Sequence, residues 1–417
     1  MGTRTRMTAA VATTLVGALL TACSTVVAGT PVAETTVSTV DSGNFPTTPR
    51  TVTAQSAADA WQQEGMILAD AVIAPSDIDP ALTALVSDEF EGAGGPLLRI
   101  GQVIERDSAR GVPTGGIPPA KAAHLELNTK FDVGFMSTAG DSATAPRMQL
   151  SAALLRFSTD AGAEKAMTTL RADTPAPDAL ARMLARIPGA VLVSSTSARG
   201  LTKTAVAAPV NNLVALVWAT TRGTDSVEPA IRGLTAQLER ATTYRPSIAL
   251  SSVAIPAVPM DRDGIMSRTL VSQNDDQNKT RTAYGLSGGV ELGDGYFTAR
   301  TAYLINRNPG WLRVATRNGI DLIGKTNRTT VLRARDRASA KVYLVEVRVD
   351  PGATQAYEVP GLPRDEAQCV HDSVLTKPYT CYATVGRYVL QADSTTLELA
   401  RQAISATYVI NKAVGEN

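Results

Sequence analysis

The sequence predicts an α+β protein made of two similar units, each an antiparallel sheet with helices packed on one face. Apolar, strand-like runs and helical segments follow one another without the regular strand–helix alternation of a parallel sheet. Several short strings recur in the same order in the two halves of the chain. Each half also ends in a segment whose apolar residues keep helical spacing. Together these observations predict two copies of one folding unit.

The recurring strings keep their order along the chain, which chance matches rarely do. The clearest pair shares Leu-Arg followed by alanines two positions apart, and another pair shares a Pro-Gly turn. An apolar run, expected to be a strand, follows each turn. In chain order the matched pairs are AHLEL (123–127) with GGVEL (288–292), LLRFSTDAGAEKA (154–166) with VLRARDRASAKV (331–342), IPG (187–189) with VPG (359–361), and LVALVWAT (213–220) with GRYVLQAD (386–393).

The segment that closes each half is predicted to be a helix. In 226–241 the apolar residues follow a 4-3-4-3 spacing, which places them on one helical face: Val227, Ile231, Leu234, Leu238 and Ala241. In 394–408 a similar stripe is formed by Leu397, Ala400, Ile404 and Tyr408. Runs such as 213–219 are apolar throughout and are predicted to be central strands.

The first 22 residues have the layout of a lipoprotein signal peptide. Arg4 and Arg6 precede an uncharged, mostly apolar stretch that is too short to span a bilayer. Leu20-Thr21-Ala22-Cys23 resembles a bacterial lipobox, which implies cleavage before Cys23 and a diacylglycerol thioether on its sulfur. The two acyl chains of such an anchor, of palmitate type, hold a protein stably on the extracytoplasmic face of the cell membrane, whereas one chain binds only marginally. The alternative is an ordinary cleaved signal with a chance cysteine.

Changes in composition divide the rest of the chain. Residues 23–50 are rich in Thr, Val, Ser and Pro and have no period, which predicts a flexible tether that carries the lipid. Residues 246–260 contain three prolines and are predicted to be a linker. The linker separates a first α+β domain at 51–245 from a second at 261–417.

The two remaining cysteines, Cys369 and Cys381, form an even pair in an exported, disulfide-permissive compartment. Their disulfide would stabilise the second domain by about 3 kcal/mol because it constrains the unfolded chain. The alternative is a metal or thiol site, which needs further ligands at suitable spacing. His371 is the histidine close to these cysteines, and the chain has 2 histidines in all. The disulfide is therefore the prediction.

Composition excludes some classes of function. The formal net charge is +1 at pH 7 and charged residues make up 19% of the chain, without clusters of Lys and Arg. Nucleic-acid binding depends on such clusters to neutralise phosphates, so it is not expected. No stretch after the signal peptide is long and apolar enough to suggest a second membrane element.

Several strings resemble an uncharacterised family of actinobacterial lipoproteins, of mycobacterial and nocardial type. They include EGMILADAVIAPSDIDPAL (64–82), DRDGIMSRTL (261–270) and NGIDLIGKTNRTTVLRARDRASA (318–340). The likeness runs from about Val40 to the C-terminus. It implies a cell-envelope location and the pairing of Cys369 with Cys381, and it implies no activity.

A serine-hydrolase pattern is present, but its context is unfavourable. GLSGG (285–289) fits the nucleophile elbow, with Ser287 as the nucleophile, followed by Asp336 or Asp365 and then His371. The elbow requires a strand before it and a helix after it, whereas strand-like sequence broken by glycines follows here. The matched place in the first half has no serine. A hydrolase that uses Ser287 is therefore a minor alternative, and no catalytic residue is predicted.

Metal and cofactor motifs are incomplete. DRDG (261–264) and NDDQN (274–278) lack the glycine and glutamate positions of a calcium-binding EF-hand loop and are expected to form turns. GAGGP (92–96) lacks the lysine of a phosphate-binding loop. His124, in a segment expected to be a strand, is interpreted as a structural residue. No metal and no cofactor are predicted.

The sequence thus predicts a surface lipoprotein that binds a ligand rather than catalysing a reaction and is attached to the membrane through Cys23. The favoured function is binding of a lipid or other apolar envelope molecule, because grooves between similar domains often form ligand sites. The alternative is a scaffold that holds a protein partner in the envelope.

Overall fold

The computed structural model describes residues 40–84, 86–87, 98–99, 102–105, 117–129, 131–198, 200–223, 225–247, 258–271, 294–306, 308–348, 355–372 and 377–415. Residues Thr39–Asn417 form one compact unit. The predicted signal peptide, Cys23 and residues 23–39 of the tether lie outside the described residues, as do Ser287 and most of the predicted linker. Among the described helices, none has the length and hydrophobicity needed to cross a membrane.

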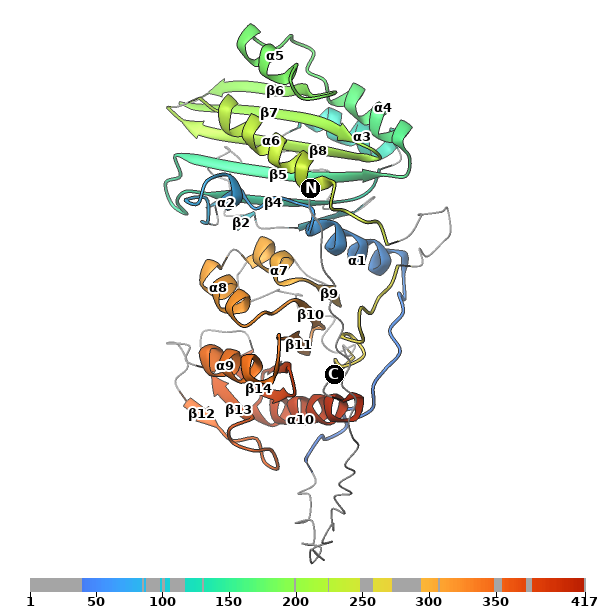
Figure 1. Cartoon of the computed structure of the whole chain (residues 1–417), viewed down its shortest axis with the longest axis vertical. Coiled ribbons are helices and arrows are strands. Elements are labelled where there is room, and N and C mark those ends of the chain that lie inside the picture. The colour runs from blue at the N-terminus through green and yellow to red at the C-terminus, as the bar shows by residue number, and fades with distance from the viewer. Residues whose placement is uncertain are drawn as a thin grey trace, which may run out of the picture. The chain divides into compact units, whose positions relative to one another are not determined.

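The described part of the first half contains a six-stranded antiparallel sheet in the order β3-β4-β5-β8-β7-β6 (Figure 1). In chain order its strands are β3 (Gln102–Glu105), β4 (Phe131–Gly140), β5 (Met148–Phe157), β6 (Val191–Ala198), β7 (Leu201–Val210) and β8 (Leu213–Arg222). A separate short pair consists of β1 (Val86–Ser87) and β2 (Leu98–Arg99). The central strand β8 is buried from Leu213 to Thr221, so both of its faces are covered.

Helices cover both faces of this first sheet. One face packs against α1 (Ala57–Ala69), α2 (Pro75–Ile78), α5 (Asp178–Leu184) and α6 (Val227–Ala241), and the other against α3 (Pro119–Asn128) and α4 (Asp160–Leu170). The neighbours Leu154 and Leu155 on β5 show the division, because Leu154 joins the apolar cluster of α6 and Leu155 joins that of α4.

The second half forms a seven-stranded antiparallel sheet within the described residues, in the order β12-β13-β14-β15-β11-β10-β9 (Figure 1). Its strands are β9 (Gly295–Phe297), β10 (Leu322–Lys325), β11 (Thr329–Arg333), β12 (Gln355–Tyr357), β13 (Ala367–His371), β14 (Tyr379–Val385) and β15 (Tyr388–Ser394). One face packs against α7 (Ala299–Asn306), α8 (Pro309–Arg317) and α9 (Arg337–Arg348), and the other against α10 (Leu397–Val414).

The predicted α+β class, with two antiparallel sheets and helices, is confirmed. The expectation that helices cover only one face of each sheet is wrong, since both sheets are covered on both faces. The physical reason was present in the uniformly apolar run at 213–219. A strand that is apolar throughout has no face suited to water and requires a covering layer on each side.

The two halves share one topology. The order β3-β4-β5-β8-β7-β6 corresponds to β9-β10-β11-β15-β14-β13, and β12 is an additional edge strand. The matched Leu-Arg strings lie where β5 leads to α4 and where β11 leads to α9. The glycines of the two Pro-Gly turns, Gly189 and Gly361, both have positive φ, of 71° and 83°. Glycine adopts this left-handed conformation without steric cost, which explains its place in both turns.

Local capping explains where the helices begin. Ser56 and Asp59 form a capping box at α1, in which the Ser56 hydroxyl accepts from Asp59 N at 3.1 Å and Asp59 accepts from Ser56 N at 2.9 Å. Thr159 caps α4 and Thr396 caps α10 in the same side-chain-to-backbone manner.

The segment AHLEL (123–127) is helical, so its prediction as a strand was wrong. It lies in α3, which begins at Pro119, and His124 is an exposed residue of that helix. Ala122 and Leu125, three positions apart, are buried in the cluster of the first sheet. Apolar residues at this spacing share a helical face, and five alternating residues are too few to distinguish the two periods. Its proposed match, GGVEL (288–292), lies outside the described residues.

The last part of the predicted tether belongs to the fold. Phe45 is 9% exposed, and the Arg328 guanidinium carbon lies 5.0 Å from its ring centroid. The Arg50 guanidinium donates to Thr269 Oγ1 at 3.1 Å, and Gln402 Nε2 donates to Asp41 at 3.2 Å. Residues 40–50 therefore pack on the second half. The Thr- and Pro-rich composition does not indicate this packing, because the packing depends on individual side chains such as Phe45, Arg50 and Asp41.

Candidate binding site between the two halves

The side chain of Gln63, on α1, binds the backbone of the edge strand β9. Gln63 Nε2 donates to Tyr296 O at 2.8 Å, and Gln63 Oε1 accepts from Tyr296 N at 3.0 Å. Gln63 is 1% exposed. An edge strand presents backbone groups that would otherwise be unpaired, and one amide satisfies a donor and an acceptor here. This contact joins the first half of the chain to the second.

Asp70 ends α1 and makes the next contact between the halves. Its Oδ1 accepts from the hydroxyls of Thr298 and Thr301, the latter at 2.9 Å. Burial raises the pKa of Asp70, while the two threonine hydroxyls and the nearby Arg300 and Arg240 oppose the rise. The position also disfavours a negative charge, since the C-terminal end of a helix carries a partial negative charge.

Further polar contacts reinforce the junction. Arg300 Nη2 donates to Asp77 Oδ2 at 2.7 Å and to Val72 O at 3.0 Å. The hydroxyls of Ser76 and Tyr303 lie 2.9 Å apart. A continuous cluster of buried apolar residues also runs through both halves, from Leu154 and Leu234 in the first to Leu304 and Leu344 in the second. The two halves are thus held by packing as well as by hydrogen bonds.

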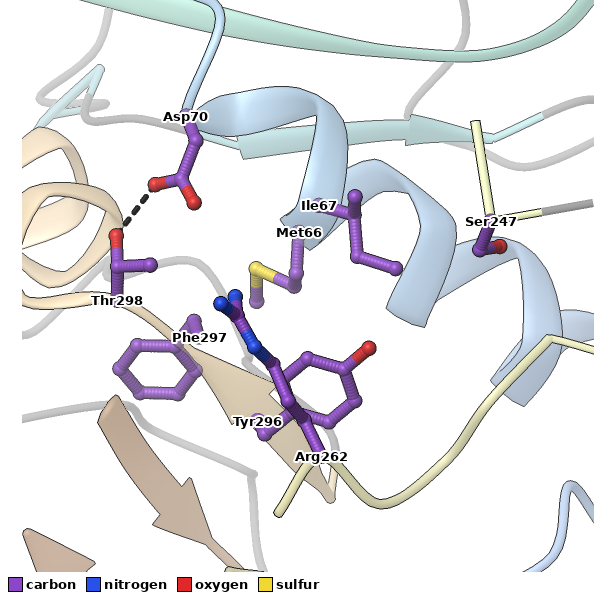
Figure 2. A pocket seen from close by; sticks show the side chains of 8 residues that line it. All are labelled: Met66, Ile67, Asp70, Ser247, Arg262, Tyr296, Phe297 and Thr298. Carbon is purple, nitrogen blue, oxygen red and sulfur yellow. Dashed lines mark hydrogen bonds between the residues drawn. The ribbon is translucent and has the colours of Figure 1, made fainter. Parts of the chain in front are cut away.

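A cavity of about 210 Å³ lies where α1 meets β9 (Figure 2). It is lined by Met66, Ile67, Asp70, Ser247, Arg262, Tyr296, Phe297 and Thr298. Pockets for drug-sized ligands occupy roughly 300–1,000 Å³. This one is smaller, so it can enclose a small group or one end of a larger molecule, and it cannot enclose a whole diacyl lipid.

Apolar and polar groups share the cavity wall. Met66, Ile67 and the ring of Phe297 supply apolar surface, and the hydroxyls of Ser247 and Thr298 supply hydrogen-bonding groups. Burial raises the pKa of Tyr296 to about 12, and this outweighs the opposing effect of Arg262. The Tyr296 phenol is therefore protonated at neutral pH and is able to donate a hydrogen bond.

Arg262 is the exposed cation of the cavity. Figure 2 shows its guanidinium extending between Met66, Phe297 and Tyr296, while one oxygen of Asp70 points toward Thr298 and the other toward the centre of the cavity. Within the described part of the chain, Arg262 forms no ion pair, with Asp70 or with another carboxylate. The cavity thus presents one acceptor carboxylate and one donor guanidinium that do not neutralise each other by direct contact.

A buried network fixes the wall that carries Ser247. Glu64, on α1, accepts from Arg156 Nη1 at 2.7 Å and from the hydroxyls of Tyr244 and Ser247. Burial, together with the Glu64 carboxylate, raises the pKa of Tyr244 far above its usual range. The network ties the chain after α6 to α1 and so holds Ser247 at the rim of the cavity.

The structure places the predicted catalytic candidates in structural roles. Asp336 accepts from Ser339 N at 2.7 Å at the start of α9, and its pKa is lowered chiefly by that backbone hydrogen bond. Asp365 pairs with Lys341 at 3.0 Å, which lowers its pKa. The His371 ring lies on β13, with its centroid 4.8 Å from that of Tyr379. Ser287 lies outside the described residues.

The turn interpretation of DRDG (261–264) agrees with the structure. Asp261 accepts from Met266 N at 2.7 Å and from Ser267 N at 3.0 Å, so both carboxylate oxygens bind backbone of the same turn. Across the described residues, no group of three or more His, Cys, Asp or Glu side chains could hold a metal ion.

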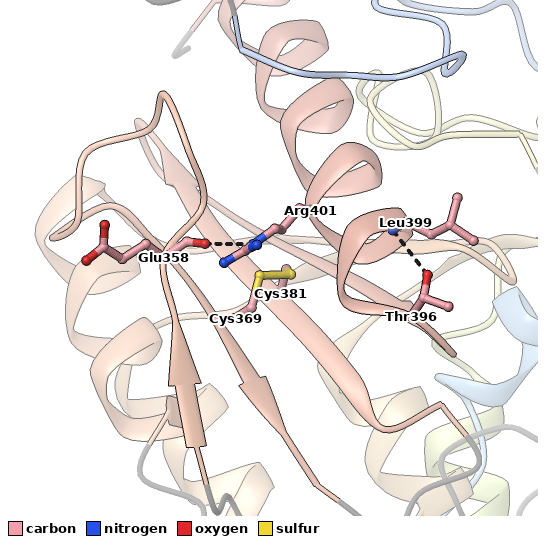
Figure 3. Close-up of a disulfide and its surroundings, with 6 residues drawn as sticks. All are labelled: Glu358, Cys369, Cys381, Thr396, Leu399 and Arg401. Atoms are coloured by element: carbon pink, nitrogen blue, oxygen red, sulfur yellow. Dashed lines mark hydrogen bonds between the residues drawn. A yellow bond between two sulfur atoms is a disulfide. The ribbon is translucent and has the colours of Figure 1, made fainter.

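The predicted disulfide is present in the structure (Figure 3). Cys369 on β13 and Cys381 on β14 are direct partners in the strand register, and both are fully buried. They lie in the apolar cluster covered by α10. On that helix Arg401 Nε donates to Glu358 O at 2.8 Å. The bond therefore joins neighbouring strands of the second sheet beneath its covering helix.

Sequence reasoning did not find the cavity residues. Met66, Ile67 and Asp70 lie in a string that carried the family resemblance, and Arg262 lies in a segment considered for calcium. Neither string has a motif that indicates a shared site. What unites them is contact between segments more than 190 positions apart, and local sequence pattern does not report such contacts.

Comparison with known proteins identifies a family. No curated protein matches the sequence. Among solved structures, the extracellular domain of PknH from Mycobacterium tuberculosis is similar at 10% identity and a TM-score of 0.25, over 43% of this chain and 96% of that one. The model described as domain of unknown function (DUF7373), N-terminal, matches residues 51–247, and its C-terminal counterpart matches residues 265–410. The predicted resemblance to an uncharacterised two-domain family is thereby confirmed, while actinobacterial origin stays a prediction. Because the two matches together span most of its length, the chain belongs to the DUF7373 family, with one N-terminal and one C-terminal domain.

Proposed function

We propose that this protein is a non-enzymatic lipoprotein of the cell envelope, anchored through a lipid on Cys23, which binds one end of an amphiphilic envelope molecule. The observation that carries the binding role is the cavity at the junction of the two halves. Its wall combines an apolar surface with a few polar groups, the usual composition of a ligand site.

The size of the cavity limits which part of a lipid ligand it can hold. A volume of about 210 Å³ lies below the roughly 300–1,000 Å³ of pockets for drug-sized ligands. A head group or a short part of a chain fits this space. The remainder of an amphiphile would leave through the exposed side, where Arg262 lies.

Native mass spectrometry tests this proposal directly. The lipoprotein is extracted gently, and its spectrum is compared with that of a fragment that begins at Thr39, because residues Thr39–Asn417 form one compact unit. The proposal expects a discrete additional mass in both samples, beyond the lipid on Cys23 in the full chain. A fragment isolated from envelope extract without any additional mass would contradict it.

A scaffold role is the second candidate, and one surface favours it. On the solvent face of α9, Ala338, Val342 and Val345 lie at positions i, i+4 and i+7, so they form one stripe. Val342 is 48% exposed and Val345 is 59% exposed. Exposed apolar side chains that line up on a helix are typical of surfaces that contact other proteins.

The scaffold role requires the exposed stripe of α9, whereas the ligand-binding role does not. Replacing Val342 and Val345 by Lys should abolish partner crosslinking in envelope preparations if the scaffold role holds, and should leave the ligand mass unchanged if the binding role holds. Both effects can be measured on one double variant.

A further inference from the structure

The cavity presents a carboxylate and a guanidinium with a gap between them. Oδ1 of Asp70 is occupied by the hydroxyls of Thr298 and Thr301, and the other oxygen points into the cavity (Figure 2). Arg262 supplies donors only, and an ionised Asp70 supplies acceptors only. A ligand group that bridges them must donate a hydrogen bond to Asp70 and accept one from Arg262.

Hydroxyl groups meet both requirements. A hydroxyl donates one hydrogen bond and accepts two, whereas a carboxylate or phosphate dianion only accepts and an ammonium only donates. Two neighbouring hydroxyls of one ring would allow Asp70 and Arg262 each to bind one. The phenol of Tyr296 adds a donor to the same wall, and the Ser247 hydroxyl oxygen, whose proton is donated to Glu64, adds an acceptor.

The surrounding charges disfavour a charged ligand of either sign. An anion at Arg262 would approach Asp70, and the carboxylates of Asp261 and Asp263 lie near the same wall, since both act on Tyr296. A cation at Asp70 would approach Arg262, and Arg300 and Arg240 lie close to Asp70 as well. Like charges brought together in a partly buried site repel each other. A neutral group is therefore preferred.

The apolar part of the wall suits a ring. Phe297 and Tyr296 present aromatic surface, and Met66 and Ile67 present aliphatic surface. The C–H faces of a saturated, hydroxylated ring pack on such surfaces while its edge hydroxyls form hydrogen bonds. The cavity is large enough for one such ring and too small for the whole of a lipid.

We propose that the cavity binds a neutral, hydroxyl-rich ring, the sugar-like head of an amphiphile, and that Asp70 and Arg262 form hydrogen bonds with its hydroxyls. This inference rests on the proposed binding function and adds the chemical class of the ligand. The Asp70 carboxylate accepts hydrogen bonds from the ring hydroxyls, the Arg262 guanidinium donates to them, and the aromatic side chains pack on the face of the ring.

The test compares three amphiphiles that share an octyl chain and differ in the head. They are octyl β-glucoside, octyl phosphate and octyltrimethylammonium, each titrated below its micelle-forming concentration into the Thr39–Asn417 fragment and followed by calorimetry. We expect the glucoside to bind at least tenfold more tightly than either charged compound. Tighter binding of octyl phosphate would overturn the inference and leave the proposed function intact. Failure of all three to bind would count against the cavity as a ligand site altogether.

Two variants identify the residues responsible. Arg262→Gln should weaken glucoside binding about tenfold, whereas Arg313→Gln, the same change at an exposed arginine of α8, should leave it unchanged. Asp70→Asn keeps an oxygen for the two threonine hydroxyls and removes the charge, so it should improve binding of octyl phosphate. Unfolding curves of each variant confirm that the fold is kept. If the three compounds bind equally and Arg262→Gln has no effect, the protein recognises only their octyl chain. That result would also overturn the inference.

Discussion

The carboxamide of Gln63 forms a two-point contact with the backbone of Tyr296, 2.8 Å from its carbonyl oxygen and 3.0 Å from its amide nitrogen. The residues are 233 positions apart in the sequence. The contact places α1 against β9, and these two elements, with the residues Asp70 and Thr298 that directly follow them, supply six of the eight residues of the cavity wall. The junction between the halves and the candidate site therefore depend on the same side chain.

Replacing Gln63 by Leu should destabilise the protein. The change leaves the buried N–H and C=O of Tyr296 without this partner, and each unsatisfied group costs about 1–3 kcal/mol. We expect the free energy of unfolding to fall by about 2–4 kcal/mol in urea denaturation. Gln55→Leu, which alters an exposed glutamine, is the control and should change little.

Gly295→Ala tests the same contact from the other side. A Cβ added at Gly295 would lie 2.6 Å from Gln63 Oε1, so the amide would have to move away from Tyr296. The expected loss is about 1–2 kcal/mol, since the displaced amide still forms weakened hydrogen bonds to Tyr296. Combined with Gln63→Leu it should cost less than the sum of the two single changes. Full additivity would show that Gly295 acts independently of Gln63.

Asp70 should make stability depend on pH in a defined direction. Its pKa in the folded state is raised above the ordinary value of 3.8, so the folded protein binds this proton more tightly than the unfolded chain does. The stabilisation is fully present below pH 3.8 and is lost as the pH rises through the folded pKa. The free energy of unfolding of Asp70→Asn, taken relative to that of the wild type, should therefore be higher at pH 7 than at pH 4. Unfolding free energies of both proteins at the two pH values measure this, and the opposite trend would refute the raised pKa.

Removing the disulfide should cost about 3 kcal/mol, because the bond restricts the unfolded chain over the segment between Cys369 and Cys381. The double variant Cys369→Ser, Cys381→Ser, compared with the wild type by thermal unfolding, measures the loss. Reducing agent should lower the wild-type midpoint toward that of the double variant and leave the variant unaffected. An identical midpoint for all samples would mean that the bond contributes nothing.

Phe45→Ala tests whether residues 40–50 are part of the fold. The ring is buried against the second half beside Arg328, and truncation of a buried Phe costs about 3–5 kcal/mol. We expect a loss near the lower end of this range, since the segment lies at the surface. A fragment that begins at Thr51 should lose at least as much stability. Unchanged stability in both would restore the view of a tether that reaches Arg50.

Much of the fold could be predicted from the sequence, because these features depend on residues that are close together along the chain. The Leu-Arg strings at 154–166 and 331–342 mark the same strand-to-helix step in both halves, and the stripes of α6 and α10 have the helical period. The second covering layer could also have been predicted from the continuous apolar run of β8. The helix at His124 was missed because five residues are too few to separate the two periods.

The candidate site could not be predicted in the same way. Asp70 and Arg262 belong to segments without a shared motif, and they line one cavity that forms where α1 packs on β9. Such a contact depends on tertiary packing between distant elements, which short-range spacing does not encode. Gln63, the residue that fixes this packing, looks in the sequence like one more polar residue of a helix.

The proposed function requires that a ligand occupies the cavity between α1 and β9. Native mass spectra of the wild-type protein and of Ile67→Trp, extracted side by side, measure this, because the larger side chain fills the cavity from α1. Thr235→Trp, at an exposed position of α6, is the matched control. We expect the wild type and the control to carry an additional mass that is absent from Ile67→Trp. The same additional mass on all three proteins would place the ligand elsewhere and contradict it.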